Sequence, residues 1–196
     1  MQYPMKMRPA FRDYLWGGKL LQQVYHKKSG FEITAESWEL SAIEPANSVI
    51  EGGVYAGVPF GRYIKEHPEA VGSGARPGEF PVLVKFLDAD TPLTIQVHPS
   101  DENALLEKGE RGKAEVWYIV AAKPGGYLYY GLSREVSREE FQKRIEDKTV
   151  LEVLNKVAVQ PGEVWFITPG VIHSAGGGVL IASHIGQINF MIGFLA

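Results

Sequence analysis

Glycine and proline interrupt this chain so often that few long helices can form. The 22 glycines and 12 prolines are distributed along 196 residues, and the apolar runs between them are short. Runs of about four to eight apolar residues bounded by turn residues are typical of strands and favour an all-β sandwich or barrel. The runs 116–120 and 164–167 are rich in the β-branched and aromatic residues that strands prefer. We therefore expect an all-β fold, with the four tryptophans packed in its core.

One stretch between the predicted strands carries a helical pattern instead. Ser137 and Glu140 have the spacing of a capping box, and apolar residues then recur at roughly helical intervals. We expect a small helical insertion at about 137–155 within a single domain that spans 1–182, because no linker or repeat divides the chain. The residues that follow, 183–196, form an apolar C-terminal tail of unusual composition.

Charge is distributed unevenly along the chain. The 20 basic and 23 acidic residues give a net charge of −3, and none of them lies beyond Glu163. This balance provides no basic field, so no nucleic-acid partner is expected. The uncharged end lacks the roughly 18 continuous apolar residues of a spanning helix, so no membrane association is expected. The absence of cysteine and of a visible secretory signal favours a cytoplasmic protein.

Without cysteine, a metal site in this chain has to be built from histidine, carboxylate or amide ligands. Gln96 and His98 are two residues apart on a predicted strand, so both side chains point to the same face. Glu115 begins a second predicted strand, and His173 follows a Pro-Gly turn at the end of a third. Each residue has an ordinary structural interpretation when taken alone, but together they resemble the two halves of a cupin metal site.

The chain resembles the type I mannose-6-phosphate isomerases, which are metal-dependent phosphomannose isomerases of the cupin superfamily. Seven segments carry the resemblance in order, namely 11–18, 36–41, 80–87, 93–99, 112–119, 162–173 and 178–182. The Gln-Val-His-Pro run at 96–99 and the Lys-Ala-Glu run at 113–115 are the most distinctive. The resemblance implies a cupin (jelly-roll) β-barrel and an isomerase that interconverts mannose 6-phosphate and fructose 6-phosphate.

The resemblance also implies roles for individual residues. It implies that one zinc ion is bound by four residues, Gln96, His98, Glu115 and His173. It implies a sugar-phosphate site at Lys85, Thr94 and Lys113, in which both lysines are also catalytic. The donor set alone suits manganese, iron or cobalt as well as zinc. The base that moves a proton between C2 and C1 stays open, with Lys113 as one candidate and a water on the metal as another.

The resemblance ends after Ala182. Family members are expected to continue with an acidic residue, a Gln-rich segment and an arginine, whereas this chain has Ser183 and no arginine after Arg144. Two interpretations therefore stay open: an isomerase, or a non-catalytic or truncated cupin that binds a metal and a sugar phosphate as a sensor or binding module. An active enzyme would need Lys85 and Lys113, or a second subunit of a homo-oligomer, to supply the missing positive charge.

Overall fold

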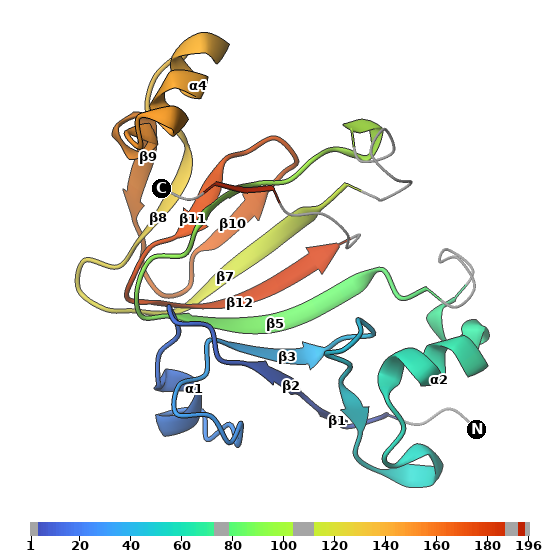
Figure 1. The fold of residues 1–196 in the computed structure, drawn as a ribbon. Helices are drawn as coiled ribbons and strands as arrows, with labels where there is room; N and C mark the ends of the chain where they lie inside the picture. The colour runs from blue at the N-terminus through green and yellow to red at the C-terminus, as the bar shows by residue number, and fades with distance from the viewer. Residues whose placement is uncertain (1–3, 73–78, 104–111, 187–191, 195–196) are drawn as a thin grey trace.

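Two antiparallel sheets form the β-barrel of this chain (Figure 1). The computed structural model describes residues 4–72, 79–103, 112–186 and 192–194. The six-stranded sheet has the order β10 (Val164–Ile167), β7 (Ala114–Ala122), β12 (Val179–Gly186), β5 (Val82–Ala89), β3 (Glu36–Leu40) and β2 (Ala10–Arg12). The five-stranded sheet has the order β13 (Ile192–Phe194), β6 (Ile95–Val97), β11 (His173–Ala175), β8 (Tyr127–Leu132) and β9 (Leu154–Ala158). The predicted all-β class is confirmed.

The remaining elements are short and lie outside the two large sheets (Figure 1). A separate two-stranded sheet pairs β1 (Met7–Arg8) with β4 (Val49–Ile50). The α-helices whose bounds the structure describes are α1 (Leu20–Gln23), α2 (Phe60–Glu66) and α4 (Arg138–Glu146), and residues 101–103 are also helical. The described residues also form the short 3-10 helices η1 (Gly53–Tyr55), η2 (Pro68–Val71) and η3 (Val150–Val153). In the described part of the chain, no helix has the length and apolar content needed to cross a membrane.

The insertion expected at about 137–155 contains α4 and η3. Ser137 caps α4 as its spacing predicts, because its hydroxyl accepts a hydrogen bond from the backbone N–H of Glu140 at 3.2 Å. The helix ends before Lys148, which has a positive φ of 58° that a continuing helix cannot accommodate. After η3 the chain is extended from Leu154, where β9 begins, so the helical part stops at Val153.

The core lies between the two sheets. Ile119 and Ile181 of the six-stranded sheet pack in one cluster with Leu128 and Ala175 of the five-stranded sheet, and all four are fully buried. Along β7, the side chains alternate between the interior and the outer face, as the period of a strand requires. Polar residues at inward positions of these strands are therefore held inside the barrel, where burial makes each of them costly unless it is paired.

Part of the uncharged end of the chain forms a central strand of the six-stranded sheet. β12 pairs with β5 on one side and β7 on the other, and it continues past Ala182 to Gly186. Ser183 and Ile185 are each 1% exposed. The absence of charge at these inward positions of β12 thus has a physical cause, because the strand is buried on its inner face. The first four residues of the predicted tail belong to this strand; the division of the chain at Ala182 stays a prediction.

Candidate metal centre

Three of the four predicted metal ligands lie together inside the barrel. One ligand atom from each of His98, Glu115 and His173 lies within 4.8 Å of the others, and all three residues are buried. His98 Nε2 is 3.0 Å from Glu115 Oε1, and the two imidazole rings are 4.7 Å apart between centroids. Two imidazoles and a carboxylate converging in this way have the donor chemistry of a divalent metal site.

Strand pairing brings these residues together from three parts of the sequence. Glu115 lies on β7 of the six-stranded sheet, whereas His173 begins β11 of the five-stranded sheet and pairs with Gln96 of β6. His98 follows β6 directly, and its carbonyl accepts a hydrogen bond from Gly170 N at 2.8 Å. Gly170 has a φ of 84°, a conformation that glycine adopts without strain. The Pro-Gly turn therefore fixes the loop before His173 against His98.

The hydrogen bonds around the three ligands leave donor atoms available for a metal. His173 Nδ1 lies 2.8 Å from the carbonyl oxygen of Val171, which fixes the N–H on Nδ1 and leaves the lone pair on Nε2. His173 Nε2 and His98 Nδ1 are buried and have no hydrogen-bond partner in the described structure. Trp117 Nε1 donates to Glu115 Oε2 and orients the carboxylate. A bound metal would satisfy His173 Nε2, so the residues present fit the implied ion.

Gln96, the fourth predicted ligand, lies beside this group. It is half-buried, pairs with His173 across β6 and β11, and lines the same cavity. Its Nε2 donates to Thr94 Oγ1 at 3.4 Å, so the amide oxygen is the atom left for a metal. Thr94 precedes β6 and is exposed at the cavity, so the predicted substrate residue and the predicted ligand are in contact.

The electrostatic environment favours the metal-binding forms of the ligands. Burial alone would raise the pKa of Glu115, but the hydrogen bond from His98 and the positive charges of Lys113 and Lys85 hold that pKa well below its usual value. Burial lowers the pKa of His173 to about 4. A carboxylate and a neutral imidazole are the forms that bind a metal, so the site needs little proton release near neutral pH.

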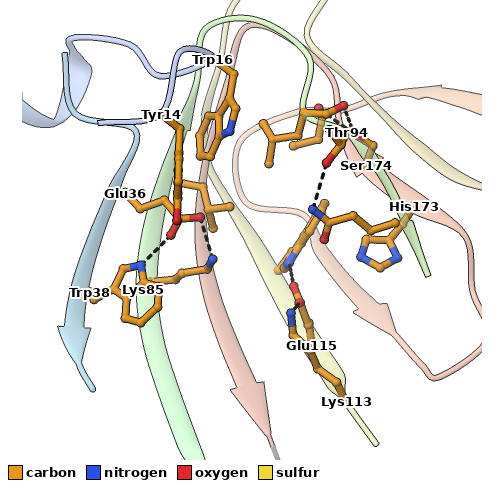
Figure 2. A pocket seen from close by; sticks show the side chains of 15 residues that line it. Tyr14, Trp16, Glu36, Trp38, Lys85, Thr94, Lys113, Glu115, His173 and Ser174 are labelled. Atoms are coloured by element: carbon orange, nitrogen blue, oxygen red, sulfur yellow. Dashed lines mark hydrogen bonds and ion pairs between the residues drawn. The ribbon is translucent and has the colours of Figure 1, made fainter. Parts of the chain in front are cut away.

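Two lysines reach the same cavity, each against a carboxylate. Lys113 Nζ is 2.6 Å from Glu115 Oε1, and Lys85 Nζ donates to Glu36 Oε1 at 2.7 Å (Figure 2). Burial lowers the pKa of Lys113, and the charge of Glu115 partly offsets this. Lys85 also lies over the ring of Trp38, 5.7 Å from its centroid, and Trp38 Nε1 donates to Glu36. Both cations are therefore held in fixed positions by buried partners.

The cavity in front of these residues has a volume of about 350 Å³. Lys85 and Lys113 line it together with Thr94, Gln96, Glu115 and His173, so the predicted substrate residues and three of the four predicted ligands share one space. Trp16, Trp38 and Trp117 also line it, so three of the four tryptophans expected in the core have a face on the cavity. Trp117 belongs to the core as well, while Trp16 and Trp165 pack against it.

Sequence reasoning missed one charged member of the site. Glu36 is 4% exposed, lines the cavity and pairs with Lys85. The signal was present in the alternation of Glu36 and Trp38, two residues apart on one strand, which places both on the same face. The local sequence could not predict that Lys85 is the partner of Glu36, because the two residues come together through the pairing of β3 with β5.

Known proteins similar to this chain belong to one family. Residues 5–127 match the family model described as phosphomannose isomerase type I, catalytic domain. The chain is 34% identical over 181 residues to a mannose-6-phosphate isomerase of Streptococcus mutans and 35% identical over 183 residues to a probable mannose-6-phosphate isomerase of Bacillus subtilis. Each alignment covers 92% of this chain, which spans 57% of the length of either relative.

A solved structure gives the same result for the fold. The crystal structure of the mannose 6-phosphate isomerase from Bacillus subtilis superposes with a TM-score of 0.91 at 29% identity. The superposition covers 98% of this chain and 61% of that one. The family resemblance expected from the sequence is thus confirmed over the barrel described above.

Proposed function

The chain belongs to the phosphomannose isomerase type I family, and from this premise we propose that it binds one zinc ion and interconverts mannose 6-phosphate and fructose 6-phosphate. The observation that carries the proposal is the convergence of His98, Glu115 and His173. Glu115 and His173 line a cavity that two lysines also line. A metal site next to paired cations suits a polyhydroxylated ligand that bears an anionic group.

In the proposed site, Gln96 completes the ligand set of His98, Glu115 and His173. Two nitrogen and two oxygen donors suit a borderline divalent ion, and the ordered hydrogen bond of His173 to Val171 supports coordination through Nε2. When bound, such an ion would polarise the oxygens at C1 and C2 of the sugar as a Lewis acid.

The lysines carry the remaining chemistry in this proposal. Lys113 is the candidate for the group that removes the proton from C2 and returns it to C1, because its lowered pKa brings a neutral amine closer to working pH. Lys85 and Thr94 bind the sugar phosphate, and the Lys85 ammonium stabilises negative charge that develops on the substrate. The aromatic side chains that line the cavity limit the access of water to the reacting carbons.

A second candidate function is a binding module that has the same site but does not convert the sugar phosphate. Among the described residues that line the cavity there are two lysines and no arginine, and both lysines are already paired with carboxylates. A protein with this arrangement could bind metal and sugar phosphate as a sensor or binding module. Loss of one cation that stabilises a transition state lowers the rate by about 10²–10³. The isomerase function therefore still predicts measurable activity, whereas the binding module predicts none.

A coupled assay with mannose 6-phosphate distinguishes the two functions. We would measure metal content and turnover of the wild type, His98→Ala and His184→Ala after loading with zinc. His184 is exposed on the outer side of β12 and serves as the matched control. We expect zinc and activity in the wild type and in His184→Ala, and neither in His98→Ala. Zinc without turnover in the wild type supports the binding module, and a wild type without metal contradicts both.

A further inference from the structure

A buried serine hydroxyl lies in the strand behind the cavity. Ser183 is in the middle of β12, and it is 1% exposed. It pairs with Lys85 on β5 and with Trp117 on β7, so it shares the inner face with these two cavity residues. Figure 1 shows β12 between these two strands. In the described structure, its Oγ makes no hydrogen bond.

Such a hydroxyl costs stability unless the functional state gives it a partner. Other buried serines are satisfied: Ser174 Oγ donates to Leu93 O at 2.9 Å, and Ser41 Oγ accepts from Ile43 N at 3.1 Å. The neighbouring inward positions of β12, Ile181 and Ile185, are apolar. A polar group that breaks an apolar row without a partner is the kind of local inconsistency that marks a functional position.

Lys85 is the cation within reach of this hydroxyl. Residues directly opposite on antiparallel strands have Cβ atoms about 5 Å apart, and Lys85 is the opposite residue on β5. An ammonium has three donors, and the bond to Glu36 on the other side uses one of them. Ser183 is uncharged, so it can accept a hydrogen bond from Lys85 without neutralising the ammonium as a second carboxylate would.

We propose that Ser183 is a positioning residue for the anionic group of the ligand, acting through Lys85. In the ligand-bound state its Oγ accepts a hydrogen bond from Lys85 Nζ, which holds the ammonium between Glu36 and Ser183 with its third donor directed at the ligand. The inference rests on the proposed sugar-phosphate site and deepens it.

The test compares Ser183→Ala with Ser183→Thr, which keeps the hydroxyl, and with Ser41→Ala as the matched buried serine. Binding of mannose 6-phosphate and of inorganic phosphate is measured by calorimetry on zinc-loaded protein, together with zinc content and the ligand-free Tm. For Ser183→Ala we expect about three- to tenfold weaker binding of both ligands, unchanged zinc and an equal or higher Tm. Ser183→Thr should bind like the wild type, whereas Ser41→Ala should lower the Tm and leave binding unchanged.

Three outcomes would overturn the inference, and they separate it from the proposed function. If Ser183→Ala binds both ligands as tightly as the wild type, Ser183 is structural and the proposed site still stands. If Ser183→Thr binds as weakly as Ser183→Ala, packing rather than the hydroxyl is responsible. If the zinc-loaded wild type binds neither ligand, the proposed function fails and the inference fails with it.

Discussion

Glu115 in the cavity and Glu140 on α4 each contact two nitrogen-bearing side chains, but the two regions differ in burial. Glu115 lies between Lys113 and His98, and its side chain is 5% exposed. Glu140 lies between Arg134 and Arg144, and its side chain is 35% exposed. Arg144 also forms an ion pair with Glu152. We call these four residues the α4 ion-pair cluster: Arg134, Glu140, Arg144 and Glu152.

This difference in burial indicates which charged residues are candidates for a functional role. In the α4 ion-pair cluster, water screens each charge, so the pairs contribute little to stability and can be lost at small cost. In the cavity, removal of one partner leaves a buried charge uncompensated, which is strongly destabilising. Buried charges therefore persist only where something else requires them, and the cavity is where the proposed metal and anionic ligand supply that requirement.

The largest effect is expected from Glu115→Gln. The substitution removes a proposed ligand and the counter-charge of buried Lys113, so zinc affinity should fall by more than about a hundredfold. Stability of the metal-free protein should fall by about 3–5 kcal/mol. Competition with a chelator and urea unfolding measure the two effects. Wild-type zinc affinity in this variant would show that Glu115 is not a ligand.

A smaller loss of zinc affinity is expected from Trp117→Phe, which removes the N–H that orients the Glu115 carboxylate. Removing such an outer partner lowers metal affinity by about 10–100-fold, and chelator competition would measure it. Trp165→Phe is the matched control, since Trp165 Nε1 donates to Glu163, which is not part of the proposed site. Equal zinc affinity in the two variants would exclude an orienting role for Trp117.

Lys85→Met should leave zinc bound and weaken the binding of the sugar phosphate. Loss of one charge-assisted hydrogen bond predicts a Kd for mannose 6-phosphate about ten- to a hundredfold higher, measured by calorimetry. Lys123→Met removes an exposed lysine that pairs with Asp90 and should change nothing at the cavity. If both variants bind alike, Lys85 does not contact the ligand.

The smallest effect is expected from Glu140→Gln in the α4 ion-pair cluster. Zinc binding should be unchanged, and the Tm at pH 7 should fall only slightly. Hydrogen bonds from Arg134 and Arg144 lower the pKa of Glu140 from 4.5 to about 2. A depressed carboxylate pKa gives stability that is present above pH 4.5 and disappears as the pH falls toward 2. The Tm difference between wild type and variant should therefore shrink across that range, and a constant difference would contradict the ion-pair explanation.

Local patterns predicted the parts of the site that lie on single strands. The two-residue spacing indicated that Lys113 lies near Glu115, although Lys113 itself precedes β7, which begins at Ala114, and the Pro-Gly turn indicated the position of His173. The structure modifies one detail, because β6 contains only Ile95–Val97, so Thr94 and His98 flank the strand rather than lie within it. Short strands end where turns and loop hydrogen bonds take over, which a local pattern does not resolve.

Contacts between distant strands could not be predicted from local patterns. The pairing of Glu36 with Lys85 and of Lys85 with Ser183 depends on the register of β3, β5 and β12, which is set by the whole barrel. Ser183 was expected to begin an atypical tail because the family resemblance ends at Ala182, yet it lies within the central strand β12, which continues to Gly186.

Anomalous X-ray diffraction at the zinc absorption edge, from crystals of the zinc-loaded protein, tests the central claim most directly. The account predicts one strong peak inside the barrel, about 2.0–2.2 Å from a nitrogen of His98, a nitrogen of His173 and an oxygen of Glu115. A crystal without a peak at these residues, or with its only strong peak elsewhere, would contradict it.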